Sequence, residues 1–205
     1  MAVRDTSIDP RLLESARKQF REKGFLGAQL SDICKDAGIT TGAIYNRYKG
    51  KEGLFEAVVK DTVDSMNNIF EDSKKVDPRK LSDEELISVW VDTEKNTRLW
   101  NERLMDMKDG LELVLKCSEG TKYSHFHEQW LEKMSDIDYD YLKVLQDREL
   151  ADKKISRKEL HVIVSAQWQL YTEPIIHGMS DNEIEHHCKV VGDLFNWQKA
   201  IGIKL

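Results

Sequence analysis

The chain has 205 residues, of which 33% are charged and 40% are hydrophobic, and its formal net charge is −6. This composition is typical of a globular protein and excludes the disordered, collagen-like and disulfide-stapled miniprotein classes. No run approaches the roughly 18 apolar residues of a membrane span, and the N-terminus lacks the apolar core of a signal peptide. The cysteines are Cys34, Cys117 and Cys188, and their odd number and wide spacing are typical of reduced thiols. We therefore expect a cytoplasmic protein without a membrane partner.

The basic residues are concentrated near the N-terminus. Residues 1–60 contain 11 Lys and Arg against 8 Asp and Glu, and residues 17–51 contain 8 against 3. Such a segment can form a phosphate-facing patch on a protein that is acidic as a whole. A solvated helix face would have a similar composition, so charge alone leaves both interpretations open.

Helical periodicity extends along nearly the whole chain and strand-like alternation is scarce, which predicts an all-α fold. The first helix is expected over residues 9–23, because Gly24 can end it. Two short helices are expected over residues 30–37 and 41–47, on either side of Gly38, which permits the left-handed conformation of a tight turn. This spacing predicts a helix-turn-helix motif. Its small core is expected to contain Leu12, Ala16, Phe20, Ile33, Ala37, Ile39 and Ile44.

A longer helix is expected to begin near Lys51 and to continue past Phe70, linking two domains. Residues 72–82 then predict a loop, and residues 82–85 predict the N-terminal cap of the next helix. An apolar stripe follows over residues 86–114, with a break expected at Asp109-Gly110. Three further helices are expected over residues 123–150, 156–178 and 181–201. Pro174, inside the second of these three, should free the carbonyl of Leu170 and kink the helix.

The N-terminal segment resembles the DNA-binding domain of the TetR family of bacterial transcriptional regulators. The resemblance depends on Gly24-Phe25 and on L-S-D-I-C-K-D-A-G-I-T-T-G-A-I-Y-N-R-Y-K-G-K-E-G-L from Leu30 to Leu54. Two positions depart from the family pattern. Ala28-Gln29 stands where a Thr or Ser cap is common, and Arg47 stands where many relatives have His. The first departure leaves the cap of the second helix open, and the second adds a permanent positive charge.

A short helix that exposes small and polar side chains can enter a DNA major groove, which is about 12 Å wide. The expected base-reading residues are Thr40, Thr41, Gly42 and Ala43. The expected phosphate-binding residues are Gln29, Ser31, Tyr45, Asn46, Arg47, Tyr48, Lys49 and Lys51. The resemblance singles out Tyr45 and Lys51 among them. The alternative is that Tyr45 or Tyr48 packs beneath the recognition helix.

The resemblance implies a DNA-binding domain over residues 1–55 and a helical ligand-binding and dimerisation domain over residues 56–205. It also implies that the last two long helices pair with those of a second copy in a four-helix bundle. The apolar residues that could form these faces include Leu160, Ile163, Val164, Leu170 and Tyr171, and then Ile184, Cys188, Val191, Leu194, Phe195 and Ile201. The alternative for each is packing inside its own chain.

A pocket for an unknown small-molecule effector is expected among residues 54–150, where the apolar stripe has aromatic and polar interruptions. The candidate ligand-binding residues are Trp90, Thr93, Thr97, Trp100, Met105, Tyr123, Phe126 and Trp130. Aromatic stripes at helical spacing also occur in ordinary cores, so simple packing is the alternative. The nearby acidic residues are Glu94, Glu102, Asp106 and Asp109. They would favour a cationic ligand if they faced the pocket. The alternative is that they form a solvated helix face.

Catalytic and metal-binding patterns are scarce. Glu183 and His186 form one E-x-x-H spacing, whereas a carboxylate-bridged metal site needs a second pair on a facing helix. We therefore expect no catalytic residue, no metal and no cofactor. The sequence predicts a homodimeric, ligand-responsive repressor that binds double-stranded, near-palindromic operator DNA. The alternatives are an interaction module of the same fold without specific DNA binding and a helical-bundle enzyme.

Overall fold

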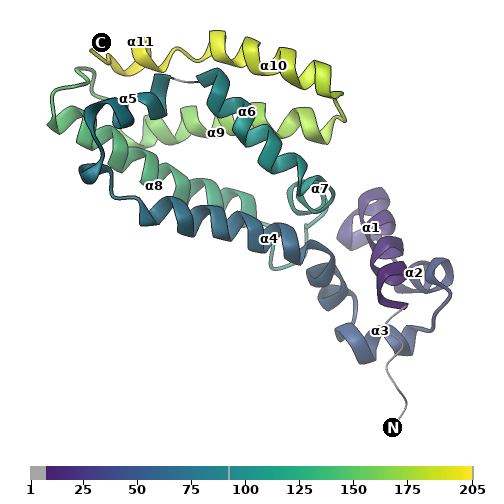
Figure 1. Cartoon of the computed structure of the whole chain (residues 1–205). Coiled ribbons are helices and arrows are strands. Elements are labelled where there is room, and N and C mark those ends of the chain that lie inside the picture. Colours follow the sequence, from purple (N-terminus) through teal and green to yellow (C-terminus); the bar gives the residue numbers. More distant parts are fainter. Residues whose placement is uncertain (1–7, 92, 205) are drawn as a thin grey trace. The chain divides into compact units, whose positions relative to one another are not determined.

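The computed structural model describes residues 8–91 and 93–204, with the side chains of Ile8, Asp9 and Thr93 left out. Helices make up most of these ranges (Figure 1), as predicted. The helices are α1 (Ile8–Gly27), α2 (Leu30–Ala37), α3 (Thr41–Tyr48), α4 (Lys51–Lys75), the 3₁₀ helix η1 (Pro78–Lys80), α5 (Asp83–Val91), α6 (Thr93–Met105), α7 (Lys108–Lys116), α8 (Phe126–Asp147), α9 (Arg157–Ile176), α10 (Asp181–Leu194) and α11 (Trp197–Ile201).

The described chain divides into two compact units. Unit 1 contains residues 8–67 and 109–127, and unit 2 contains residues 68–108 and 128–204. Helix α4 therefore contributes its first part to unit 1 and its last part to unit 2. The predicted functional boundary between residues 55 and 56 stays a prediction. No helix in the described ranges has both the length and the apolar character needed to cross a membrane.

The core of unit 1 is built around the first four helices. Helix α1 packs on α2, and Leu12, Ala16 and Phe20 of α1 are fully buried in the same cluster as Ile33 and Ile44. The predicted small core is therefore confirmed. The cluster also includes further side chains of α4 and α7, namely Leu54, Phe55, Val58, Val59, Val63, Leu113 and Val114.

Two predicted helix ends need correction. Asp109-Gly110 does not interrupt the stripe, because both residues lie inside α7 and the turn falls at residues 106–107 instead. A Cβ atom on Gly110 would lie 2.0 Å from the Thr62 hydroxyl oxygen, so glycine permits close packing between α7 and α4. The predicted last helix is also divided, since α10 ends at Leu194 and α11 begins at Trp197.

Other predicted boundaries are confirmed by local hydrogen bonds. Gly24 adopts φ 67° and interrupts regular helix near the end of α1. Ser82 and Glu85 form a reciprocal capping box, in which each backbone N–H donates to the other residue's side chain, at 2.8 Å and 3.2 Å. The predicted loop over residues 72–82 needs correction, because α4 continues to Lys75 and η1 spans Pro78–Lys80.

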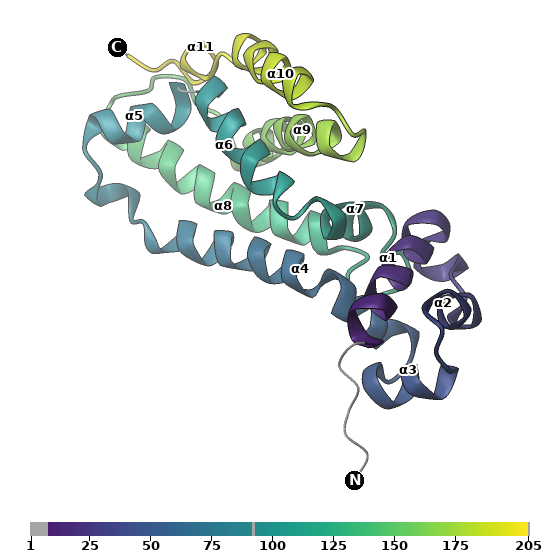
Figure 2. The ribbon, with the colours of Figure 1, turned by 45° about the vertical axis from the view of Figure 1, so that its right-hand side comes forward.

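In unit 2, α6 packs against both α9 and α10 (Figure 2). Pro174 lies within α9 and leaves the carbonyl of Leu170 without its usual helical donor, as predicted. The Nε2–H of His187, on α10, donates to that carbonyl oxygen at 2.8 Å. The proline thus creates an acceptor that joins α9 to α10.

The apolar faces of α9 and α10 are largely used within unit 2. Leu160 and Cys188 are fully buried, and Tyr171, Val191 and Ile201 are also buried. For these five residues, of which Ile201 lies on α11, the alternative of packing inside their own chain is confirmed, whereas Leu194 of the predicted set is exposed. The large apolar side chains that these two helices leave exposed are Val162, Val190 and Leu194.

Candidate nucleic-acid interface and ligand cavity

The turn between α2 and α3 holds the predicted recognition helix in place. Gly38 adopts φ 67° and ψ 36°, a left-handed conformation that glycine tolerates best. The N–H of Ile39 then donates to the carbonyl of Cys34 at 3.0 Å, which closes the end of α2. Ile44 is fully buried and anchors α3 from below. The opposite face of α3 is left at the surface.

The N-terminal end of α3 presents small side chains. Thr40 is the N-cap residue in an extended conformation, and Thr40, Thr41 and Gly42 are exposed, whereas Ala43 is partly buried. The Cys34 thiol contacts the Thr41 hydroxyl oxygen at 3.7 Å, which helps to orient that hydroxyl. These four positions therefore form the low-profile surface that entry into a major groove requires.

Polar side chains flank this surface. Tyr45 is 57% exposed, and Asn46 and Lys49 are also exposed, so the three can reach DNA phosphates. Tyr48 instead is partly buried and packs against the core of unit 1, as its alternative interpretation predicted. Arg47 is partly buried. The start of α2 adds the exposed residues Gln29 and Ser31; within the described chain, Gln29 forms no side-chain cap.

Lys51 has an internal role that its sequence position does not reveal. Its ammonium group donates to the carbonyl of Ala28 at 2.8 Å and to that of Leu26 at 3.2 Å. It also lies 4.6 Å from the centre of the Phe25 ring, close enough for a cation–π contact. Burial lowers the pKa of this ammonium. Lys51 therefore ties the start of α4 to the end of α1.

We expect Lys51→Met to lower the free energy of unfolding by roughly 1.5–3 kcal/mol, because two charge-assisted hydrogen bonds are lost while the apolar stem is kept. Urea denaturation followed by circular dichroism measures this change. Lys35→Met is the matched control, since Lys35 is exposed on α2. Equal stability of the two variants would contradict a structural role for the Lys51 ammonium.

Part of the N-terminal positive charge is neutralised within unit 1. Arg21 pairs with Glu112 at 2.8 Å and with Asp109 at 3.1 Å, and Lys23 pairs with Asp32 at 2.8 Å. Fewer unpaired positive charges are therefore left at the surface than the number of basic residues in this segment suggests. Exposed cations close to α3 are supplied by Lys35 and Lys49.

Unit 2 contains a cavity of about 530 Å³, within the range of small-molecule sites. We call it the aromatic cavity. Residues from α4, α5, α6, α8, α9 and α11 line it. Trp100, Trp130 and Trp168 line it, with ring centroids 4.5–6.2 Å apart, and the Tyr171 ring stacks 6.3 Å from Trp100. Trp90 and Trp197 form a second, edge-to-face pair 5.1 Å apart.

The aromatic cavity brings together some of the predicted ligand-binding residues. Trp90, Trp100 and Trp130 line it. Thr97 is fully buried and hydrogen-bonds Tyr171 behind the lining. Met105 lines a separate pocket on α6 and α10.

Three other predicted ligand-binding residues are not placed at the aromatic cavity. Tyr123 and Phe126 pack against the core of unit 1, where the Tyr123 ring lies 6.4 Å from that of Phe55. The side chain of Thr93 lies outside the described residues. The predicted set therefore mixed residues of two different compact units.

Several lining residues were missed at the sequence level. Trp168 and Tyr171 are spaced three apart on α9, and Asp138 and Tyr141 are spaced three apart on α8. This spacing places each pair on one helix face, which was an available signal. The expected pocket was confined to residues 54–150, and α9 lies beyond that range.

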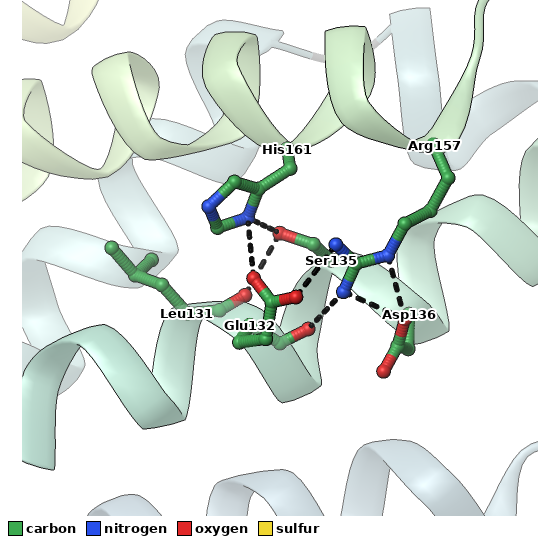
Figure 3. A network of polar contacts seen from close by, with 6 residues as sticks. All are labelled: Leu131, Glu132, Ser135, Asp136, Arg157 and His161. Atoms are coloured by element: carbon green, nitrogen blue, oxygen red, sulfur yellow. Dashed lines mark hydrogen bonds and ion pairs between the residues drawn. The ribbon is translucent and has the colours of Figure 1, made fainter.

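A polar network joins α8 to α9 and bears on the enzyme alternative (Figure 3). His161 Nδ1 lies 2.9 Å from the Ser135 hydroxyl oxygen and 3.4 Å from a Glu132 carboxylate oxygen. The Ser135 hydroxyl donates to the Leu131 carbonyl at 2.8 Å, so His161 Nδ1–H is the donor to Ser135. A catalytic triad instead uses opposite ring nitrogens, and its histidine accepts the serine proton. Arg157 bonds Glu132 at 2.7 Å, which makes the network an interhelical clamp.

Comparisons with known proteins support the nucleic-acid interface. Residues 12–58 match the family model described as "Bacterial regulatory proteins, tetR family". The transcriptional regulator UidR of Escherichia coli K12 is 39% identical over 49 residues, which are 24% of this chain and 25% of UidR. IcaR of Staphylococcus aureus strain Newman, a negative transcriptional regulator of the icaADBC biofilm operon, is 34% identical over 59 residues, which are 29% of this chain and 32% of IcaR.

The chain therefore matches only about a quarter to a third of the length of these two relatives. Comparison with a solved structure shows a likeness in fold over most of the chain. The transcriptional regulator FadR of Bacillus subtilis, in complex with stearoyl-CoA, is 14% identical, covers 91% of this chain and 96% of its own, and has a TM-score of 0.55. At this identity the likeness shows a similar fold.

Proposed function

We propose that this chain, whose residues 12–58 match the tetR-family model, is a cytoplasmic, homodimeric, ligand-responsive repressor of transcription that binds a near-palindromic operator. The observation that carries the proposal is the exposed, small-residue end of α3 above the buried Ile44. An α-helix of this profile fits the major groove, where base edges are read. IcaR, a negative regulator, supports the repressor assignment.

Base reading is assigned to Thr40, Thr41, Gly42 and Ala43. Thr41 can hydrogen-bond base edges, and Ala43 can contact a thymine methyl group. Tyr45, Asn46 and Lys49 are exposed beside them and are assigned to phosphates. The predicted contacts of Gln29, Ser31, Arg47, Tyr48 and Lys51 remain part of the proposal; Lys51 retains a third ammonium N–H after its two carbonyl bonds.

A homodimer is proposed because one short recognition helix reads too few base pairs for selectivity. Two copies related by a two-fold axis read two half-sites about 34 Å apart. Val162 on α9 is 67% exposed, as is Leu194 on α10, and Val190 is 48% exposed. Apolar side chains at such exposure are suited to burial against a second copy.

Ligand response is assigned to the aromatic cavity of unit 2. FadR is described in complex with stearoyl-CoA, and its fold likeness supports an effector site in the helical part of this chain. Ser73 of α4 lines the cavity, and α4 begins at Lys51, directly after the recognition helix. A ligand that binds one conformation better by about 1–3 kcal/mol would change operator affinity about 5–150-fold.

The test is selection of bound duplexes from a random DNA pool by purified protein, followed by sequencing. We expect a two-fold-symmetric site. Thr41→Ala should relax base preference within each half-site while leaving the dependence of affinity on salt unchanged. Lys51→Met should reduce the salt dependence if its third N–H reaches a phosphate.

Failure to enrich any sequence, with folded and dimeric protein, would contradict the proposed function and favour the interaction-module or enzyme alternatives. An enriched site without two-fold symmetry would contradict the homodimeric arrangement alone. An unchanged salt dependence in Lys51→Met would assign Lys51 a purely structural role.

A further inference from the structure

The aromatic cavity has an acidic side chain among its mostly apolar and aromatic lining residues. Among its described lining residues, Asp138 is the single acid and Arg103 the single base. Asp138 lies on α8, two turns after Trp130, and is partly buried, whereas Arg103 is exposed on α6. The negative charge is therefore the more enclosed of the two.

Among the described residues, the Asp138 carboxyl group has no counterion. In the part of the chain that the structure describes, no hydrogen bond or ion pair joins it to another side chain. Desolvation raises its pKa to about 7, and its charge contributes to the raised pKa values of Tyr141 and Tyr171. A desolvated carboxylate without a partner is costly, and a ligand that supplies the missing positive charge would remove that cost.

The aromatic rings around the cavity are suited to the same charge. The faces of tryptophan and tyrosine rings attract cations through their quadrupoles. Trp100 already does so, because the Arg103 guanidinium lies 5.8 Å from the centre of its ring. Trp130, Trp168 and Tyr171 are more than nine-tenths buried and supply apolar area to the same walls.

We propose that the aromatic cavity binds a lipophilic organic cation, whose charged centre faces Asp138 and whose apolar groups contact the tryptophans. This inference rests on the proposed function, since it names the chemical class of the effector. An anionic ligand would place a second negative charge near the Asp138 carboxylate. A neutral ligand would leave that carboxylate without a counterion. The ligand chemistry that satisfies both the acid and the rings is a quaternary ammonium, a protonated amine or a phosphonium.

Two ions of nearly the same shape and opposite charge test the proposal. Isothermal titration calorimetry of the full chain with tetraphenylphosphonium and with tetraphenylborate compares charge at constant size. We expect the phosphonium to bind at least tenfold more tightly than the borate. Asp138→Asn should reduce phosphonium affinity at least tenfold and narrow the difference between the two ions, because the amide keeps the shape of the carboxyl group without its charge.

Asp140→Asn is the matched control, since Asp140 is an exposed acid on the same helix and lies outside the aromatic cavity. It should leave both affinities within twofold of the wild type. Circular dichroism confirms that each variant is folded. If Asp138→Asn fails to fold, Trp100→Leu takes its place as the test variant. The affinities of the two ions are then compared between the wild-type protein and Trp100→Leu, which should bind the phosphonium severalfold more weakly.

Equal binding of the two ions, tighter binding of the borate, or an unchanged phosphonium affinity in Asp138→Asn would overturn the proposal. Operator selection without any ligand is a separate measurement. A protein that enriches a symmetric operator but does not prefer the phosphonium would retain the proposed function and refute the cationic effector. A protein that prefers the phosphonium but enriches no DNA would retain the cation-binding cavity and refute the proposed function.

Discussion

Phe55→Ala is expected to lower the free energy of unfolding of unit 1 by about 3–5 kcal/mol, as is typical when a buried aromatic side chain is truncated. Phe55 is fully buried, and its ring contacts those of Phe20, Phe25 and Tyr123, with centroids 5.0, 5.5 and 6.4 Å away. The substitution therefore leaves a cavity where α1, α4 and the segment before α8 meet. Since small domains are stable by about 5–15 kcal/mol, this loss is large.

Urea denaturation followed by far-ultraviolet circular dichroism measures the Phe55→Ala loss. Leu26→Ala is the control within the same unit, because Leu26 is 59% exposed and its truncation should change stability by less than about 0.5 kcal/mol. DNA affinity of Phe55→Ala should fall as the temperature approaches its lowered midpoint. A loss below about 1 kcal/mol would mean that the ring cluster does not hold unit 1 together.

Asp138→Asn is expected to stabilise the protein increasingly as the pH rises. The pKa of Asp138 is about 7 in the folded chain, against an ordinary value of 3.8, so the folded state holds the proton more tightly than the unfolded state. Stability of the wild type therefore falls as the pH rises from about 4 to about 7 and then levels off. Between pH 4 and pH 8 the variant should gain roughly 2–4 kcal/mol relative to the wild type.

The gain is measured as the difference between the two unfolding free energies at each pH, so that groups common to both proteins cancel. The groups near Asp138 belong to three helices and are Arg103 on α6, Tyr141 on α8 and Tyr171 on α9. Asp140→Asn, which removes an exposed acid on the same helix, is the control and should change the free energy of unfolding by less than about 0.5 kcal/mol. If the difference in unfolding free energy between Asp138→Asn and the wild type does not change with pH, the Asp138 carboxyl group is well solvated.

The sequence by itself determined the helical class, most helix positions and the helix-turn-helix, because the signals for these features are local. Gly38 permits the left-handed turn, and Ser82 with Glu85 caps α5 within four residues. Pro174 necessarily frees the carbonyl of Leu170, four positions earlier. The N-terminal motif is equally local, since it occupies one continuous stretch from Leu30 to Leu54.

Only the tertiary structure decided which faces meet, because helical periodicity identifies an apolar face but does not identify its neighbour. Gly110 looked like a helix break, yet it lies inside α7 against Thr62, 48 positions earlier in the chain. Tyr123 joined the core of unit 1 because Phe55 lies beside it, and the Lys51 ammonium turned inward to carbonyl groups near the end of α1. Asp138 gained its distinctive environment from tryptophans on other helices, and such long-range desolvation has no local signature in a sequence.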